Sequence, residues 1–162
     1  MGSAAAGVAM TGAPLAALPA GFHVPAEEDR HQRTFMQWPV NRRVHPDGVF
    51  LDMTQQTIAD VANAIAQFEP VTMLAHADDH AGARVKLASN VELLYVPTED
   101  LWCRDAGPLF AKGRDGSPAA SHIRFNGWGE KQVNTLDSQI AAEVARHLGS
   151  ALSRRPVVSL CA

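Results

Sequence analysis

The segment TEDLWCRDAGPLF, residues 98–110, sets two acids, a tryptophan, a cysteine and an Arg-Asp pair within eight positions. A carboxylate beside an aromatic face suits a planar cation, because guanidinium N–H groups donate to a carboxylate in pairs and the ring adds a cation–π attraction. Asp105 and Trp102 are the side chains that fit this description. The alternative is a tryptophan in the core and an Arg104–Asp105 pair that braces a turn, and spacing alone leaves both open.

The preceding element positions this segment. Residues 91–96 form an apolar run that predicts a buried strand, and ligands of α/β proteins bind at the carboxyl ends of such strands. If the following residues are extended, Arg104 and Asp105 point to opposite faces, so that one lines a site and the other ties down the scaffold. Glu99 and Asp100 would then offer carboxylates at the mouth of the site.

Alternating strand and helix patterns along the chain indicate an α/β fold. Apolar residues at helical spacing predict a helix between an N-cap at Asp52 and Pro70, and a second helix from Leu136 to Gly149. A shorter helix is expected over 76–88. Strands are expected at 34–38, 71–75, 91–96, 108–112, 120–125 and 157–160, the fourth and fifth of them paired as a hairpin.

Composition narrows the class of protein. A chain of 162 residues with 46% hydrophobic residues and a net charge of -3 is typical of one soluble domain. The chain has no excess of basic residues, so a nucleic acid partner is not expected, and nothing in its composition draws it to a membrane surface. Cys103 and Cys161 are too few for a disulfide framework, so the cytoplasm is the expected compartment.

Residues 1–21 are rich in alanine and other small or apolar residues and carry no charge. They look like the apolar and cleavage regions of an export signal, but the positive front is missing. Two interpretations stay open: a disordered leader, or a truncated signal peptide on an exported protein. The folded domain is expected over residues 22–162.

Four segments resemble the agmatine deiminase and bacterial peptidyl-arginine deiminase family: VPAEEDRHQRTFMQWPVN, FEPVTMLA, TEDLWCRDAGPLF and RFNGWGEK. They follow the family's order and approximate spacing over residues 22–149. The resemblance implies the pentein α/β propeller, built from five ββαβ-type units, of which this chain would supply about two. It also implies hydrolysis of a guanidino group to a ureido product and ammonia, without a metal or organic cofactor. The substrate would be agmatine, as in putrescine biosynthesis, or an arginine derivative, including a peptide.

The resemblance assigns roles within the W-x-R-D motif. Asp105 corresponds to the aspartate that grips the guanidinium group, Trp102 to the tryptophan that lines the pocket, and Arg104 to a scaffold residue. Cys103 occupies the variable position and is therefore not expected to be the nucleophile. Trp128 and its neighbours would either join the rim of the pocket or form a turn around a buried tryptophan.

The nucleophile and base of the family are expected elsewhere. Its E-G-G, H-x-D and C-terminal cysteine motifs have no counterpart after residue 105, and Cys161 lacks the surrounding motif. We therefore expect the N-terminal part of a deiminase, inactive on its own. The rival hypotheses are a non-catalytic half-propeller that associates with itself or with another chain, and an unrelated domain that binds an anion near Gly107.

The histidines give weaker evidence for a functional site. His76 and His80 have a spacing that suits a metal, but a helix N-terminus capped by Asp78 or Asp79 explains the same segment. His45 and the other histidines are expected in loops or at the surface.

Overall fold

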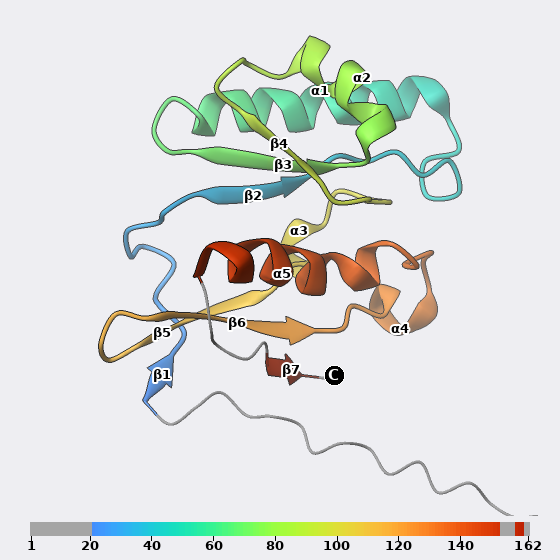
Figure 1. Ribbon diagram of the computed structural model, residues 1–162. Helices are drawn as coiled ribbons and strands as arrows, with labels where there is room; N and C mark the ends of the chain where they lie inside the picture. Colours follow the sequence, from blue (N-terminus) through green and yellow to red (C-terminus); the bar gives the residue numbers. More distant parts are fainter. Residues whose placement is uncertain (1–20, 153–157, 161–162) are drawn as a thin grey trace, which may run out of the picture.

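The computed structural model describes residues 21–152 and 158–160, and shows two sheets with helices packed against them (Figure 1). α1 (Gly48–Ile65) and α2 (His80–Lys86) cover the outer side of one sheet, and α5 (Ile140–Leu152) lies between the two sheets. The predicted leader lies outside the described residues, apart from Gly21, and so does Cys161.

The first sheet contains three parallel strands in the order β2-β3-β4: β2 (Thr34–Gln37), β3 (Val71–Ala75) and β4 (Glu92–Tyr95). All five residues of the central strand β3 are buried. A parallel strand covered on both faces is expected to be a continuous apolar run, which is why its sequence VTMLA predicted it.

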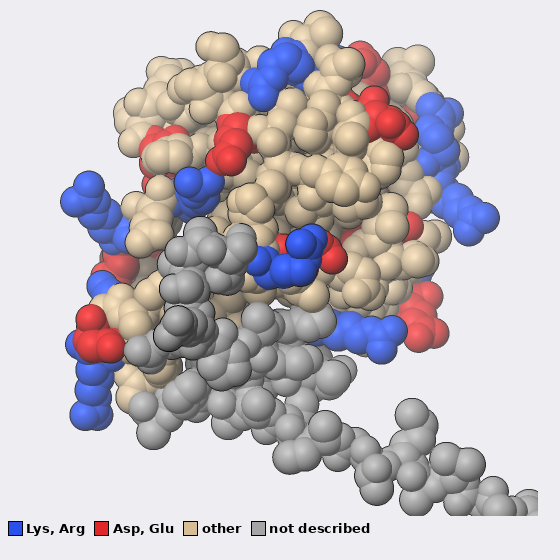
Figure 2. All heavy atoms as spheres, viewed as in Figure 1, with Lys and Arg blue, Asp and Glu red and all other residues tan. Residues whose placement is uncertain are grey.

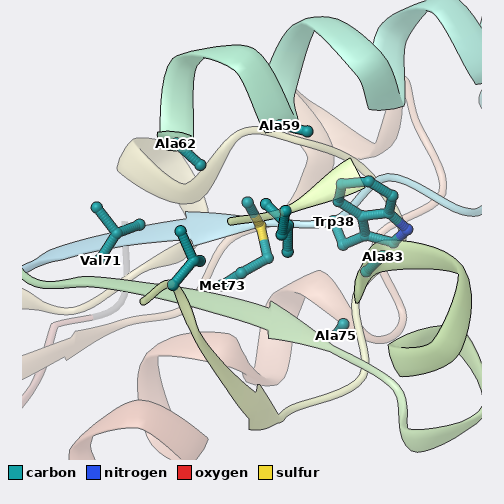
Figure 3. Close-up of a cluster of buried hydrophobic side chains, with 9 residues drawn as sticks. Trp38, Ala59, Ala62, Val71, Met73, Ala75 and Ala83 are labelled. Carbon is teal, nitrogen blue, oxygen red and sulfur yellow. The ribbon is translucent and has the colours of Figure 1, made fainter. Parts of the chain in front are cut away.

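Small side chains bring α1 close to this sheet. Ala59 and Ala62 are fully buried on the side of the helix that faces the strands, against Met73 and Val71 of β3 (Figure 3). Trp38, which follows β2, fills the end of the same cluster and is 2% exposed. Close packing of this kind holds the carboxyl ends of β2 and β3 in fixed positions.

The second sheet has the strand order β1-β5-β6-β7. β5 and β6 form an antiparallel hairpin, and β6 pairs in parallel with β7 after α5 has crossed between them. This β-β-α-β sequence is the unit implied by the resemblance to penteins. The strands are β1 (Phe22–His23), β5 (Leu109–Gly113), β6 (Pro118–Ile123) and β7 (Val158–Leu160).

A second buried cluster joins the two layers. Leu74 of β3 and Val96 after β4 pack with Phe125 after β6 and with Ile140 and Val144 of α5. The 98–110 segment runs from β4 of the first sheet to β5 of the second, and its Ala106 and Cys103 pack in this cluster.

Several boundaries differ from the sequence prediction by a few residues, and the start of α1 is one of them. Asp47, and not Asp52, caps α1: its side chain accepts hydrogen bonds from the N–H groups of Val49 and Phe50 at 2.8 and 3.2 Å. Asp52 lies inside the helix and pairs with Lys86 at 2.8 Å.

The start of the helical segment after β3 and both ends of the last helix also differ from the prediction. The His76 ring accepts from the N–H of Asp78 at 3.2 Å, so a histidine caps the turn η1 (Ala77–Asp79) in place of the predicted aspartates. The last helix opens with η2 (Asp137–Gln139), and α5 continues past Gly149 to Leu152.

The surface carries both signs of charge. Acidic and basic side chains lie interspersed on the face shown in Figure 2. Within the described residues, no helix combines the length and the apolar character that crossing a bilayer requires.

Candidate functional site

The middle of the 98–110 segment is a turn of helix, α3 (Cys103–Ala106), and not an extended strand. The N–H of Gly107 closes it by donating to the Cys103 carbonyl at 2.9 Å. A Cβ atom at Gly107 would meet that oxygen at 2.5 Å, so glycine permits the tight exit. The predicted alternation of Arg104 and Asp105 was therefore wrong, and both side chains are exposed.

Asp105 and Arg104 do not pair with each other. Arg104 pairs with Glu27, and both side chains are largely exposed, at 84% and 77%. Among the described residues no salt bridge involves Asp105; its Oδ1 accepts the indole N–H of Trp128 at 3.4 Å. The Asp105 charge is therefore available to a cation from solution.

Two exposed indole rings stand beside this carboxylate. Trp102 and Trp128 are 47% and 41% exposed, and their ring centroids lie 5.9 Å apart in an edge-to-face arrangement at 86°. Phe125, which is buried, supports Trp128 at 4.9 Å and 85°. The alternatives that placed either tryptophan in the core were wrong.

Trp128 is held by an unusual turn. In α4 (Gly127–Glu130) all four residues have positive φ, at 63°, 55°, 79° and 60°. The N–H of Glu130 donates to the Asn126 carbonyl at 2.7 Å, so the segment is one turn of left-handed helix. Such a conformation costs about 1–2 kcal/mol for each residue with a side chain.

Glu99 and Asp100 are not at the mouth of a site. They are 4% and 3% exposed, and their side chains serve as hydrogen-bond acceptors inside the protein. Asn41 donates to Glu99 at 3.0 Å, and the N–H of Leu136 donates to the other Glu99 oxygen at 2.9 Å. These two carboxylates therefore anchor the segment, and the prediction that they face a ligand was wrong.

Asp137 is the centre of this buried network. Its oxygens accept the backbone N–H groups of Glu99 and Asp100 at 2.8 and 3.1 Å, and Oδ1 also accepts the Gln37 amide at 3.2 Å. Because Gln37 ends β2 and Glu99 and Asp100 follow β4, Asp137 ties the start of the segment to the carboxyl end of β2.

Asp100 extends the network to two further elements. His45 lies 2.9 Å from Asp100 Oδ1, Leu101 donates its N–H to the same oxygen at 2.8 Å, and Gln132 donates to Oδ2. His45 lies in a loop, as predicted, but it is only 7% exposed and belongs to the buried network. Gln132 follows the left-handed turn and thereby ties that turn to the segment.

Burial changes the acidity of two groups. The pKa of Asp137 is raised from 3.8 to about 6. Burial is the main cause; the two backbone N–H donors lower the pKa, and the neighbouring carboxylates of Glu99 and Asp100 raise it. Burial, with the nearby Asp137 charge, raises the pKa of Cys103 from 9.0 to about 12. Since the thiolate is the nucleophilic form, Cys103 is not an activated cysteine.

Comparison with known proteins identifies the family. A family profile described as Porphyromonas-type peptidyl-arginine deiminase matches residues 23–159. The chain belongs to this family. An agmatine deiminase from Ectopseudomonas mendocina is 39% identical over 110 residues, which cover 67% of this chain and 29% of that protein. A Streptomyces coelicolor relative is 37% identical over 138 residues, 85% of this chain and 40% of its own length.

Solved structures of the family share the fold. The agmatine deiminase of Enterococcus faecalis has a TM-score of 0.69 at 21% identity, covering 88% of this chain and 38% of that one. A Campylobacter jejuni agmatine deiminase with substrate bound has a TM-score of 0.67 at 20% identity, covering 86% and 39%. The pentein fold predicted from the resemblance is confirmed, and the chain spans about 40% of the length of these relatives.

Proposed function

We propose that this chain forms the guanidinium-binding part of a deiminase that converts a guanidino group to a ureido group and ammonia. The single observation that supports this is the exposed Asp105 carboxylate, which has no salt-bridge partner among the described residues and stands beside two half-exposed indoles. A carboxylate accepts two parallel N–H donors from a guanidinium ion, and indole faces attract the delocalised charge.

Each residue has a separate role in this proposal. Asp105 binds the guanidinium, Trp102 forms a wall of the site, and Arg104 is a scaffold residue whose exposed ion pair with Glu27 adds little stability. The substrate is a small molecule such as agmatine, or a peptide arginine. Both carry the same planar cation, and the described residues recognise that shared group.

The nucleophilic step needs a thiolate that attacks the guanidinium carbon, expels ammonia and is released by water. Cys103 does not supply it, because its pKa of about 12 keeps the thiol protonated at neutral pH. We therefore expect the 162-residue chain to bind the cation and to produce no ureido product by itself.

Isothermal titration with butylguanidinium and butylammonium tests the binding role. The two ligands share the alkyl chain, and only the first presents a planar fork of donors. We expect the guanidinium compound to bind more tightly, and Asp105→Asn to weaken it by about tenfold or more. Asp29→Asn, at an exposed aspartate of the N-terminal segment, is the matched control and should leave binding unchanged.

Equal affinity for the two ligands would contradict guanidinium recognition. An Asp105→Asn variant that binds as well as Asp29→Asn would contradict the assignment of Asp105.

A second candidate role, self-association, is favoured by an exposed apolar patch at the start of α1. Val49, Phe50 and Met53 are 73%, 59% and 62% exposed and share one side of the helix. Sedimentation velocity should show an association that Phe50→Ser weakens. A monomer at all concentrations would remove this candidate.

A further inference from the structure

The left-handed turn α4 is unexpected between a strand and a helix. Two of its residues, Trp128 and Glu130, have side chains that make a positive φ unfavourable. Backbone strain of this kind persists only where surrounding contacts impose it, and it is found preferentially at functional sites.

Contacts on both sides hold the turn in place. The Asn126 side chain accepts the N–H of Gly129 at 3.1 Å. At Gly127 a Cβ atom would lie 2.5 Å from the Gln132 carbonyl and 2.6 Å from the Asn134 side chain, so only glycine fits. Gly129 has the same left-handed backbone, but a Cβ atom there would meet nothing within 4 Å. A substitution at Gly129 can therefore strain its φ without any steric clash.

The turn determines where the Trp128 side chain lies. Its N–H reaches Asp105 Oδ1 at 3.4 Å, and its ring meets the Trp102 ring edge to face at 5.9 Å. Asp105 and Trp128 are 23 residues apart, and this contact directly links the left-handed turn to the carboxylate of the proposed site.

We propose that Trp128 is a positioning residue of the guanidinium site, held in place by the left-handed turn. Its indole N–H holds one oxygen of Asp105, which orients the carboxylate toward the ligand, and its ring meets the Trp102 ring edge to face, so that the two indoles form one continuous wall. This role depends on the proposed function of Asp105 and adds a residue outside the W-x-R-D motif.

Four variants separate this role from general stability. Trp128→Phe keeps an aromatic ring and removes the N–H donor. Gly129→Ala strains the turn at a position with open space, and Gly129→Asn tests rescue, because asparagine tolerates positive φ. Gly116→Ala is the matched control: Gly116 lies in the β5–β6 hairpin, has the same φ of 79° and has the same open surroundings.

Two measurements apply to every variant. Far-ultraviolet circular dichroism records exciton coupling between the Trp102 and Trp128 rings and needs no ligand. Titration with butylguanidinium records affinity. We expect Gly129→Ala to lose most of the coupling and to bind about three- to tenfold more weakly, and Trp128→Phe to bind about threefold more weakly. Gly116→Ala and Gly129→Asn should keep both the coupling and the affinity.

Different results would contradict the positioning role of Trp128 and the proposed function of Asp105. If wild type binds in an Asp105-dependent manner while Gly129→Ala and Trp128→Phe bind like Gly116→Ala, the positioning role is wrong and the function stands. If Asp105→Asn does not weaken binding, the proposed function and the positioning role both fail. Retained coupling in Gly129→Ala would contradict the claim that the turn places Trp128.

Discussion

Residues 98–101 and residues 102–105 lie next to each other in one segment and use the same kinds of side chain in opposite ways. Glu99 and Asp100 are buried and accept several hydrogen bonds each. Asp105 is exposed and accepts one indole N–H. Acids that are clustered in the sequence therefore need not form one site: residues 98–101 anchor the segment inside the protein, whereas the Asp105 side chain is exposed to solvent.

The buried network around Glu99 and Asp100 should carry the stability, so we expect the largest effect at its central residue, Asp137. Asp137→Ala leaves the N–H groups of Glu99 and Asp100 without their acceptor, and we expect a loss of about 3–5 kcal/mol in the free energy of unfolding. Asp105→Ala should change it by less than about 0.5 kcal/mol. Urea unfolding followed by circular dichroism measures both; equal losses would erase the distinction between the buried network and the exposed Asp105.

The pH dependence of the free energy of unfolding tests the buried network around Asp137 in a second way. Because the pKa of Asp137 is raised from 3.8 to about 6, the folded state holds this proton while the unfolded state releases it. The contribution is fully present below pH 3.8 and is lost as the pH rises through about 6. Asp137→Asn lacks this loss, so its stability relative to wild type should improve between these pH values and then stay level. A relative decline over the same range would contradict the raised pKa.

Cys103 lies within residues 102–105 but is only partly exposed, and its thiol should react as a buried group. With a pKa of about 12, its thiol should react with a disulfide reagent at pH 8 about a hundredfold or more slowly in the folded protein than in urea. Cys161→Ser isolates the signal of Cys103. Rapid reaction of the folded variant would show an accessible, activated thiol and reopen its role in catalysis.

The exposed pair of Arg104 and Glu27 should give the smallest effect. An ion pair in water contributes little, so we expect Arg104→Ala to cost about 0.5 kcal/mol or less. Thermal unfolding of Arg104→Ala, Glu27→Ala and the double variant measures the coupling between the two side chains. A coupling above about 1 kcal/mol would mean that this pair braces the segment more strongly than its exposure implies.

The sequence predicts the elements well where apolar residues repeat with a regular period. The strand VTMLA was placed correctly, and Ile58, Ala62 and Ile65 of the predicted helix face the core. Two further members of the predicted apolar stripe are exposed: Val61 is 44% exposed, and Phe68, beyond the end of α1, is 89% exposed. The start of α1 was misplaced because Asp47 and Asp52 are equally suitable N-caps, and only the structure shows which N–H groups each one reaches.

The site was predicted only in part. The exposed aromatic and acidic side chains of W-x-R-D were named from their motif, but the buried network was not. Acids and histidines are rarely buried, so no sequence pattern indicated that Glu99, Asp100 and His45 lie inside the protein. The signal that was available is Asp137, an aspartate at the start of a predicted helix; its partners in two distant strands depend on the tertiary fold.

The most direct test of the account follows the three indole N–H resonances by NMR during titration with agmatine. Trp102 and Trp128 are exposed beside Asp105, whereas Trp38 is buried in the other layer. We predict that the first two resonances shift with a common dissociation constant, that Trp38 stays fixed, and that Asp105→Asn abolishes the shifts. Agmatine that moves none of them, or moves them equally in Asp105→Asn, would contradict guanidinium binding at this carboxylate.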